Sequence, residues 1–336
     1  MMMLASLLGV MMVGAAFVGP MPGDEDEEDA ASNSDDLEDQ DDLLKGIENQ
    51  PPEPIDDNLL HTIEGDEETN LLVGTEDDDV MFGFGAFDEI GGNDGDDEIF
   101  AGEGDDYAYG HEGSDTIHGG EGSDHLEGDA GDDLLRGGIG DDSLYGGADD
   151  DVIEAGDGDD VLVGGEGADA LHGGDDDDQL QGMNGDDTLS GGAGSDALFG
   201  GYGDDLLDGR QINENGKDVD EMDFLNGGAD DDTVIAGAGD FVNLGAGEDA
   251  LIVGDWIEET NALVQDFNAE EDKLVVVYDD AEGEAVPSLE LVEDDDTPGV
   301  TYVVLNGTSL LAVEDAGGLT LAHIELVPQS TVGASS

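Results

Sequence analysis

Aspartate recurs in the middle of the chain at intervals of nine residues. From Gly92 to Asp208 the sequence divides into thirteen consecutive nine-residue units without an insertion, and the sixth position of each unit is aspartate. Calcium takes six to eight oxygen ligands from carboxylates and backbone carbonyls. The spacing therefore predicts a row of calcium sites whose carboxylate ligands are Asp97, Asp106, Asp115, Asp124, Asp133, Asp142, Asp151, Asp160, Asp169, Asp178, Asp187, Asp196 and Asp205.

Looser units of the same kind flank these thirteen. Before them, Asp78 is followed by Val80 and Asp88 by Ile90. After them, Asp223, Asp232 and Asp249 stand two residues before Leu225, Val234 and Leu251. We therefore add Asp78, Asp88, Asp223, Asp232 and Asp249 to the predicted metal ligands.

The other positions of the unit explain how such a row could form. The eighth position is Ile or Leu in every unit but one, where it is Ala108, and the first and fourth positions are nearly always glycine. Glycine permits backbone conformations that a Cβ atom forbids, so neighbouring turns can approach and present their carbonyl oxygens to the gap between them. In a short strand over the last three positions, the eighth side chain would point inward and its neighbours toward solvent.

The unit GGxGxDxUx, in which U is a large aliphatic residue, resembles the nonapeptide of the RTX or haemolysin-type calcium-binding repeats over about residues 74 to 252. The resemblance implies an all-β protein with a calcium-stabilised parallel β-roll. The first six residues of each unit would form a calcium-binding turn and the last three a short strand. Two units would make one coil, so that aspartates eighteen residues apart stack on one edge.

That arrangement places the thirteen aspartates on two edges. Asp97, Asp115, Asp133, Asp151, Asp169, Asp187 and Asp205 would share one edge, and the other six would share the second. Stacked neighbours would give eleven pairs and hence eleven calcium sites. One aliphatic side chain in nine residues is a small core against the conformational entropy of ordering the chain. We therefore expect calcium binding and folding to be one event.

Composition excludes several classes of partner. The chain carries 92 acidic and 5 basic residues in 336, a formal net charge of -87. Nucleic acid and anionic lipid need Lys or Arg to neutralise phosphate, so neither is an expected partner. Multivalent cations are the natural counterpart. The sequence has no cysteine, which excludes disulfides and cysteine-based zinc sites.

The chain divides into five segments on composition and periodicity. Residues 1–22 are apolar and uncharged, as in a membrane anchor or an export signal, and residues 23–58 form an acidic linker that we expect to be disordered. The β-roll is predicted over 59–254 with a loop at about 209–222, followed by a β-rich C-terminal domain over 255–330 and a tail over 331–336.

The interrupting stretch GRQINENGKDVDEMDF, residues 209 to 224, leaves two interpretations open. Its oxygen-bearing side chains at Asn213, Asn215, Asp218, Asp220 and Asp223 could hold one more calcium, or the stretch could be an exposed loop. Asp223 lies eighteen residues after Asp205, which predicts that both residues share one edge.

From about Asp255 the pattern changes to longer apolar strands. The predicted strands are ALVQDF, DKLVVVYD, SLELVED, VTYVVLNG, SLLAVED and IELV. This region resembles the C-terminal part of calcium-binding RTX proteins of roseobacter-type marine bacteria. The resemblance implies a C-terminal secretion signal, export by type I secretion machinery as an unfolded chain, and folding in calcium-rich medium.

No residue pattern indicates catalysis. No histidine begins an HExxH motif, and His118 and His172 would lie too far apart on one edge to share a metal. The sequence has no GxSxG motif and no P-loop, and we expect Trp256 to be a packing residue at the C-terminal end of the roll. We predict a secreted or cell-surface calcium-binding protein, structural or adhesive and not an enzyme. The alternative is an accessory or fragment of an RTX-type secreted hydrolase or toxin.

Overall fold

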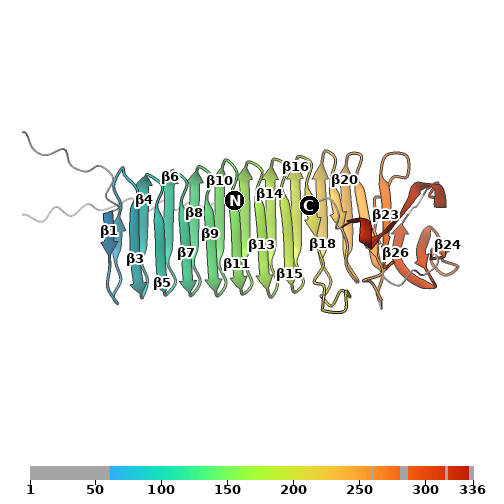
Figure 1. Ribbon diagram of the computed structural model, residues 1–336, viewed down its shortest axis with the longest axis horizontal. Coiled ribbons are helices and arrows are strands. Elements are labelled where there is room, and N and C mark those ends of the chain that lie inside the picture. Colours follow the sequence, from blue (N-terminus) through green and yellow to red (C-terminus); the bar gives the residue numbers. More distant parts are fainter. Residues whose placement is uncertain (1–60, 259, 281–286, 315–316, 333–336) are drawn as a thin grey trace, which may run out of the picture. The chain divides into compact units, whose positions relative to one another are not determined.

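The chain folds into a parallel β-solenoid with two sheets (Figure 1). The computed structural model describes residues 61–332 except 259, 281–286 and 315–316. The apolar segment 1–22, the linker 23–58 and most of the 331–336 tail lie outside the described residues. All the elements below belong to the unit Asn58–Ser336.

From β1 to β23, successive strands alternate between the two sheets. In spatial order the first sheet contains β1 (His61–Glu64), β3 (Asp79–Gly85), β5 (Glu98–Glu103), β7 (Thr116–Glu121), β9 (Leu134–Ile139), β11 (Val152–Asp157), β13 (Ala170–Asp175), β15 (Thr188–Ala193), β17 (Leu206–Asp208), β19 (Thr233–Ile235), β21 (Ala250–Gly254), β23 (Lys273–Tyr278) and β27 (Ile324–Pro328). The second contains β2 (Leu71–Val73), β4 (Glu89–Asp94), β6 (Tyr107–Glu112), β8 (His125–Ala130), β10 (Ser143–Ala148), β12 (Val161–Glu166), β14 (Gln179–Asn184), β16 (Ala197–Tyr202), β18 (Phe224–Ala229), β20 (Phe241–Ala246), β22 (Ala262–Val264), β26 (Thr308–Glu314), β25 (Val300–Leu305) and β24 (Leu289–Glu293).

Two nine-residue units make one coil, as predicted. Leu144 of β10 lies opposite Leu162 of β12, and Ile153 of β11 lies opposite Leu171 of β13, so each strand pairs with the strand eighteen residues later. We call the thirteen units from Gly92 to Asp208 the regular array. All strand pairings within it are parallel. The all-β fold class and the parallel β-roll are confirmed.

The array strands β5 to β16 are six residues long, so the prediction of three-residue strands was wrong for them; β17, which precedes the loop, has three residues. In β10 the strand covers the last three positions of one unit and continues through Gly146, Gly147 and Ala148 of the next. The first three positions join the ladder because the glycines there let adjacent coils approach. A Cβ atom on Gly120, whose φ is +126°, would lie 2.0 Å from the carbonyl oxygen of Gly102 in the preceding coil.

The core of the array is one cluster of eighth-position side chains, with one column from each sheet. Every one of these residues in the array is buried, from Ile99 through Leu207, including the exception Ala108. Each of these strands also buries its first-position residue, usually a glycine, on the same face. The array therefore contains about one large buried side chain per nine residues.

The loop increases the sequence separation between paired residues of neighbouring coils from 18 to 27. β15 pairs with β17 and β17 with β19, and Leu206 lies opposite Thr233. Phe224 of β18 instead lies opposite Ala197 of β16, in the other sheet. The expectation that Asp223 follows Asp205 on one edge was therefore wrong. Between Asp205 and Asp223 the chain advances by only half a coil. The loop accounts for the remaining length, which equals one nine-residue unit.

The C-terminal strands continue both sheets. Each predicted apolar segment contains a strand, from β22 to β27. β23 and β27 extend the first sheet in parallel, whereas β24, β25 and β26 end the second sheet as an antiparallel meander. The one-turn helices η1 (Leu321–His323) and α1 (Gln329–Val332) flank β27. Among the described residues no helix has the length and apolarity to cross a membrane.

Candidate metal centre

The aspartates at the sixth position form two ladders, one before the strands of each sheet. Each side chain is at most 3 % exposed. In each ladder the backbone N–H of one aspartate donates to Oδ1 of the aspartate one coil later, as from Asp142 to Asp160 at 2.7 Å and from Asp151 to Asp169 at 2.9 Å. One carboxylate oxygen of each residue is therefore used to connect neighbouring coils.

The other oxygen of each ladder carboxylate has no partner. Oδ2 is buried and without a hydrogen bond in Asp88 and in every aspartate at the sixth position from Asp97 to Asp205. A buried polar atom without a partner costs free energy, and an ionised oxygen costs more. A row of such atoms is an arrangement that a bound cation would satisfy.

Glycine makes room for these oxygens. A Cβ atom on Gly146 would lie 2.2 Å from Oδ2 of Asp151 in the same unit. A Cβ atom on Gly119 would lie 2.3 Å from Oδ2 of Asp124 and 2.7 Å from the carbonyl oxygen of Gly137. The free carboxylate oxygens therefore lie beside the first-position glycines, close to backbone carbonyls of the adjoining coil.

The electrostatics of the ladders oppose ionisation. Burial, followed by the charge of neighbouring aspartates, raises the pKa of Asp142 to about 7 and that of Asp151 to about 8. Hydrogen bonds from the backbone lower these pKa values only in part. A cation beside the carboxylates would remove this penalty.

The donor set fits calcium. It consists of carboxylate and carbonyl oxygens, which a hard divalent cation prefers, and it contains neither sulfur nor imidazole nitrogen. The ladder aspartates would hold the ions, and glycine carbonyls of adjoining coils, which flank the same first-position glycines, would supply further oxygen ligands. Such a donor set is suited to reversible cation binding at regular intervals.

Comparison with known families agrees with this geometry. A family model described as RTX calcium-binding nonapeptide repeat (4 copies) matches more than half of the chain, at residues 64–90, 91–126, 118–153, 127–162, 145–180, 154–189, 181–211 and 220–251. The chain belongs to the RTX calcium-binding repeat family. A search of curated proteins found no match.

The structure places most of the predicted RTX ligands in the ladders. All thirteen array aspartates are there, together with Asp88, Asp223, Asp232 and Asp249. After the loop Asp223 stacks on Asp196, and Asp232 stacks on Asp205. Their role as calcium ligands stays a prediction.

The structure does not place Asp78 in a ladder. Asp78 is exposed, and its carboxylate accepts a hydrogen bond from the backbone N–H of Asp96. Asp79 occupies the ladder position instead, because it is fully buried and its N–H donates to Oδ1 of Asp97 at 2.7 Å. Counting eighteen residues back from Asp97 would have identified it.

Sequence reasoning also missed Asp240. This residue is fully buried, and its Oδ1 accepts the N–H of Asp223 at 3.2 Å, so it continues the ladder of Asp196 and Asp223. Its Oδ2 accepts the N–H of Gly237 at 2.6 Å, so both of its oxygens have partners. The available signal was that Asp240 stands two residues before Val242, as the sixth-position aspartate of an RTX unit stands two residues before its aliphatic residue.

The histidines and the tryptophan have structural contacts. His111 contacts Asp129 at 2.9 Å, and His118 stacks on Phe100 with ring centroids 4.8 Å apart. Among the described residues, the group whose ligand atoms come together as in a metal site is Asp196, Asp220 and Asp223, which contains no histidine. Trp256 packs as predicted: it is 5 % exposed, and its indole N–H donates to the carbonyl of Ala236 at 2.9 Å.

Proposed function

We propose that this RTX protein binds a row of calcium ions between successive coils and that binding folds the array. The observation that carries the proposal is the buried, unpartnered carboxylate oxygen repeated in each unit. Two stacked aspartates, such as Asp142 and Asp160, supply carboxylates to one gap, and glycine carbonyls supply the remaining oxygen ligands. Binding then compensates the cost of burying charge and adds free energy that the narrow core lacks.

Equilibrium dialysis of the purified full chain tests this function. At millimolar free calcium we expect several ions per chain, with little magnesium bound at the same concentration, because magnesium demands a more rigid octahedral shell. Zinc at micromolar concentration should not replace calcium, since the ladders offer no sulfur or nitrogen ligand. Binding of fewer than two calcium ions per chain would contradict the proposal.

We propose further that the protein is secreted or held at the cell surface, where its role is structural or adhesive. The proposed folding of the array on calcium binding supports this, because millimolar calcium is found outside cells. The resemblance of the C-terminal region to that of type I secretion substrates supports it as well. Fractionation of producing cells, with the mass of the N-terminal peptide, tests the location. Recovery of the folded protein in the cytosolic fraction alone would contradict it.

We also propose that the chain has no catalytic activity of its own. The support is the sequence, which lacks cysteine and contains no HExxH or GxSxG motif. Purified protein should show no peptidase, lipase or esterase turnover. Hydrolysis that a single acidic substitution abolishes would contradict this assignment.

A further inference from the structure

The loop after β17 brings an additional carboxylate to one ladder. In the regular array the fourth-position glycine donates its N–H to the backbone carbonyl of the third-position residue one coil later. Gly167 donates in this way to Asn184 at 3.0 Å, and Gly185 donates to Tyr202 at 2.8 Å. The third-position side chain takes no part in that bond.

At the loop a side chain replaces this backbone carbonyl. Asp220 stands at the third position relative to Asp223, and its Oδ1 accepts the N–H of Gly194 at 2.8 Å. Its second oxygen, Oδ2, is buried and has no hydrogen-bond partner. Substitution of a carboxylate for a carbonyl therefore adds a full negative charge and an unpartnered oxygen at this coil.

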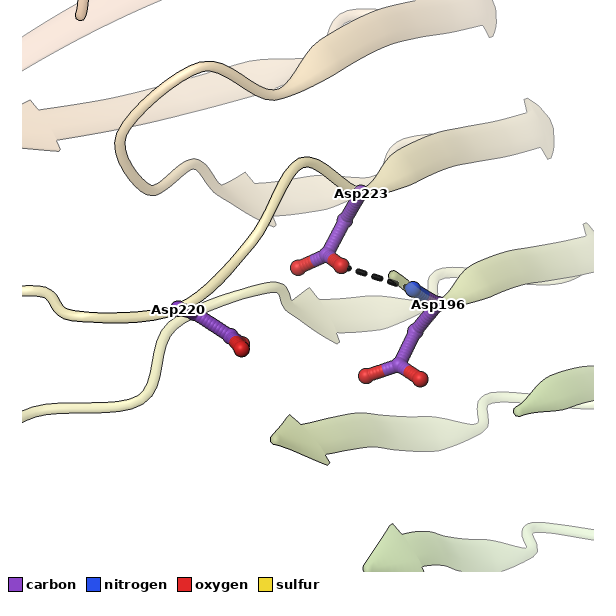
Figure 2. A group of neighbouring side chains, drawn as sticks. All are labelled: Asp196, Asp220 and Asp223. Carbon is purple, nitrogen blue, oxygen red and sulfur yellow. Dashed lines mark hydrogen bonds between the residues drawn. The ribbon is translucent and has the colours of Figure 1, made fainter. Parts of the chain in front are cut away.

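Three carboxylates converge as a result (Figure 2). Oxygen atoms of Asp196, Asp220 and Asp223 all lie within 4.8 Å of one another. Asp196 and Asp223 are 2 % and 1 % exposed, and the Oδ2 atom of each is also unpartnered. The N–H of Asp196 donates to Oδ1 of Asp223 at 2.8 Å, and the N–H of Asp178 donates to Oδ1 of Asp196 at 2.9 Å. These two bonds hold two of the three carboxylates in place.

The basic side chains of the loop are engaged elsewhere. Arg210 pairs with Asp208 at 2.7 Å and lies over the ring of Trp256, while Lys217 pairs with Glu258 at 3.2 Å. The negative charge of the cluster is therefore uncompensated by these side chains.

We propose that Asp196, Asp220 and Asp223 form a three-carboxylate calcium site that binds more tightly than the two-carboxylate sites of the regular array. The inference rests on the proposed function, since it assumes that the ladders bind calcium. Calcium affinity rises with the number of charged ligands. Asp220 is the residue that makes this coil different from the others.

The other oxygen-bearing side chains of the loop do not join this site. The Oδ1 and Oδ2 atoms of Asp218 accept the N–H groups of Gln211 and Ala238. The side-chain oxygen of Asn213 accepts those of Asn215 and Lys217. The side-chain oxygens of Asn213 and Asp218 therefore have partners within the protein, and Asp220 is the loop residue next to the ladder.

Calcium retained by the full chain at buffered, limiting free calcium tests the inference. The test variant is Asp220→Asn, which keeps an acceptor oxygen for Gly194 and removes the charge. The control is Asp175→Asn, because Asp175 has the same position and charge, is exposed, and accepts from Gly158 through its backbone carbonyl. Bound calcium is counted by atomic spectrometry, and circular dichroism at saturating calcium verifies folding.

We expect the wild type and Asp175→Asn to retain one ion at a free calcium concentration on the order of tenfold lower than that required by the remaining sites. Asp220→Asn should lose this early ion and bind the others normally. Equal retention by the two variants would overturn the inference while leaving the proposed function intact. A folding defect of Asp220→Asn at saturating calcium would also overturn it, since it would assign Asp220 a structural role. Failure of the wild type to bind calcium would refute the proposed function itself.

Discussion

The regular array and the C-terminal part of the roll share two sheets but differ in what stabilises them. β10 of the array buries one large side chain, Leu144, whereas β23, of equal length, buries Leu274, Val276 and Val277. The array also carries an unpartnered carboxylate oxygen in each unit. Among the described residues after Asp240, the buried side-chain atom without a partner is the hydroxyl of Ser309.

This difference indicates two sources of stability in one continuous structure. Apolar burial contributes roughly 25 cal/mol per Å², so the C-terminal strands gain far more per residue than the array does. The array must compensate buried charge before its narrow core can stabilise it. We therefore expect the array to depend on calcium and the C-terminal part to be much less dependent.

Removal of calcium should have the largest effect. In excess chelator, backbone amides from Gly92 to Asp208 should lose protection against hydrogen exchange, while those of β23 and β26 keep most of theirs. Hydrogen exchange with mass spectrometry on the full chain measures both regions at once. Equal loss of protection in both regions would remove the distinction between them.

Acid should partly replace calcium in the array. Burial raises the pKa of Asp124 and Asp133 from 3.8 to about 7, so the stability gained by protonation is fully present below pH 3.8 and is lost as the pH rises through 7. In chelator, β structure should therefore increase as the pH falls from 8 to 4. Circular dichroism, with light scattering to detect aggregation, measures this, and an array equally unfolded at both pH values would contradict the pKa argument.

Truncation of the core should cost a smaller, local amount. At saturating calcium Leu162→Ala should destabilise the protein by about 2–5 kcal/mol, because it truncates one of the few large side chains in the buried core of the array. The control Val152→Ala changes a side chain that is 41 % exposed and should cost less than about 0.5 kcal/mol. Urea unfolding measures both, and equal costs would show that the core does not stabilise the array.

Coupling between ladder aspartates should be the smallest effect. Asp142→Ala and Asp160→Ala remove carboxylates from the same gap between coils. The loss of folding free energy in the double variant should therefore be smaller than the sum of the two single losses, by about 0.5–3 kcal/mol. Asp142 and Asp151 belong to different ladders and should be close to additive. Calcium-dependent folding midpoints of the single and double variants give both values, and equal coupling in the two pairs would contradict the two-ladder arrangement.

The fold of the array was predicted from the resemblance of its nine-residue unit to the RTX repeat, and the periodicity is consistent with that fold. Aspartate, glycine and one aliphatic residue at fixed positions leave one register in which the aliphatic columns are buried. Strand length was underestimated because the sequence shows which positions are glycine but not that their backbones pair with the next coil. Asp79 was missed because three consecutive aspartates, Asp77 to Asp79, hide the register.

The loop could not be predicted for a different reason. Its length equals one unit, so the spacing from Asp205 to Asp223 is the same for a complete coil as for half a coil followed by a loop. Only the path of the chain shows that Asp223 stacks on Asp196. The convergence of Asp220 with these two residues depends on that path and has no periodic signal.

The central claim is that calcium in the aspartate ladders folds the array, and one titration tests it directly. Bound calcium and the β signal in circular dichroism are measured on the same full-length sample as free calcium is raised from chelated to millimolar concentration. The account predicts that the β signal of the array is absent in chelator and that it rises cooperatively together with bound calcium. A complete β spectrum in excess chelator, or calcium binding without a gain of β structure, would contradict it.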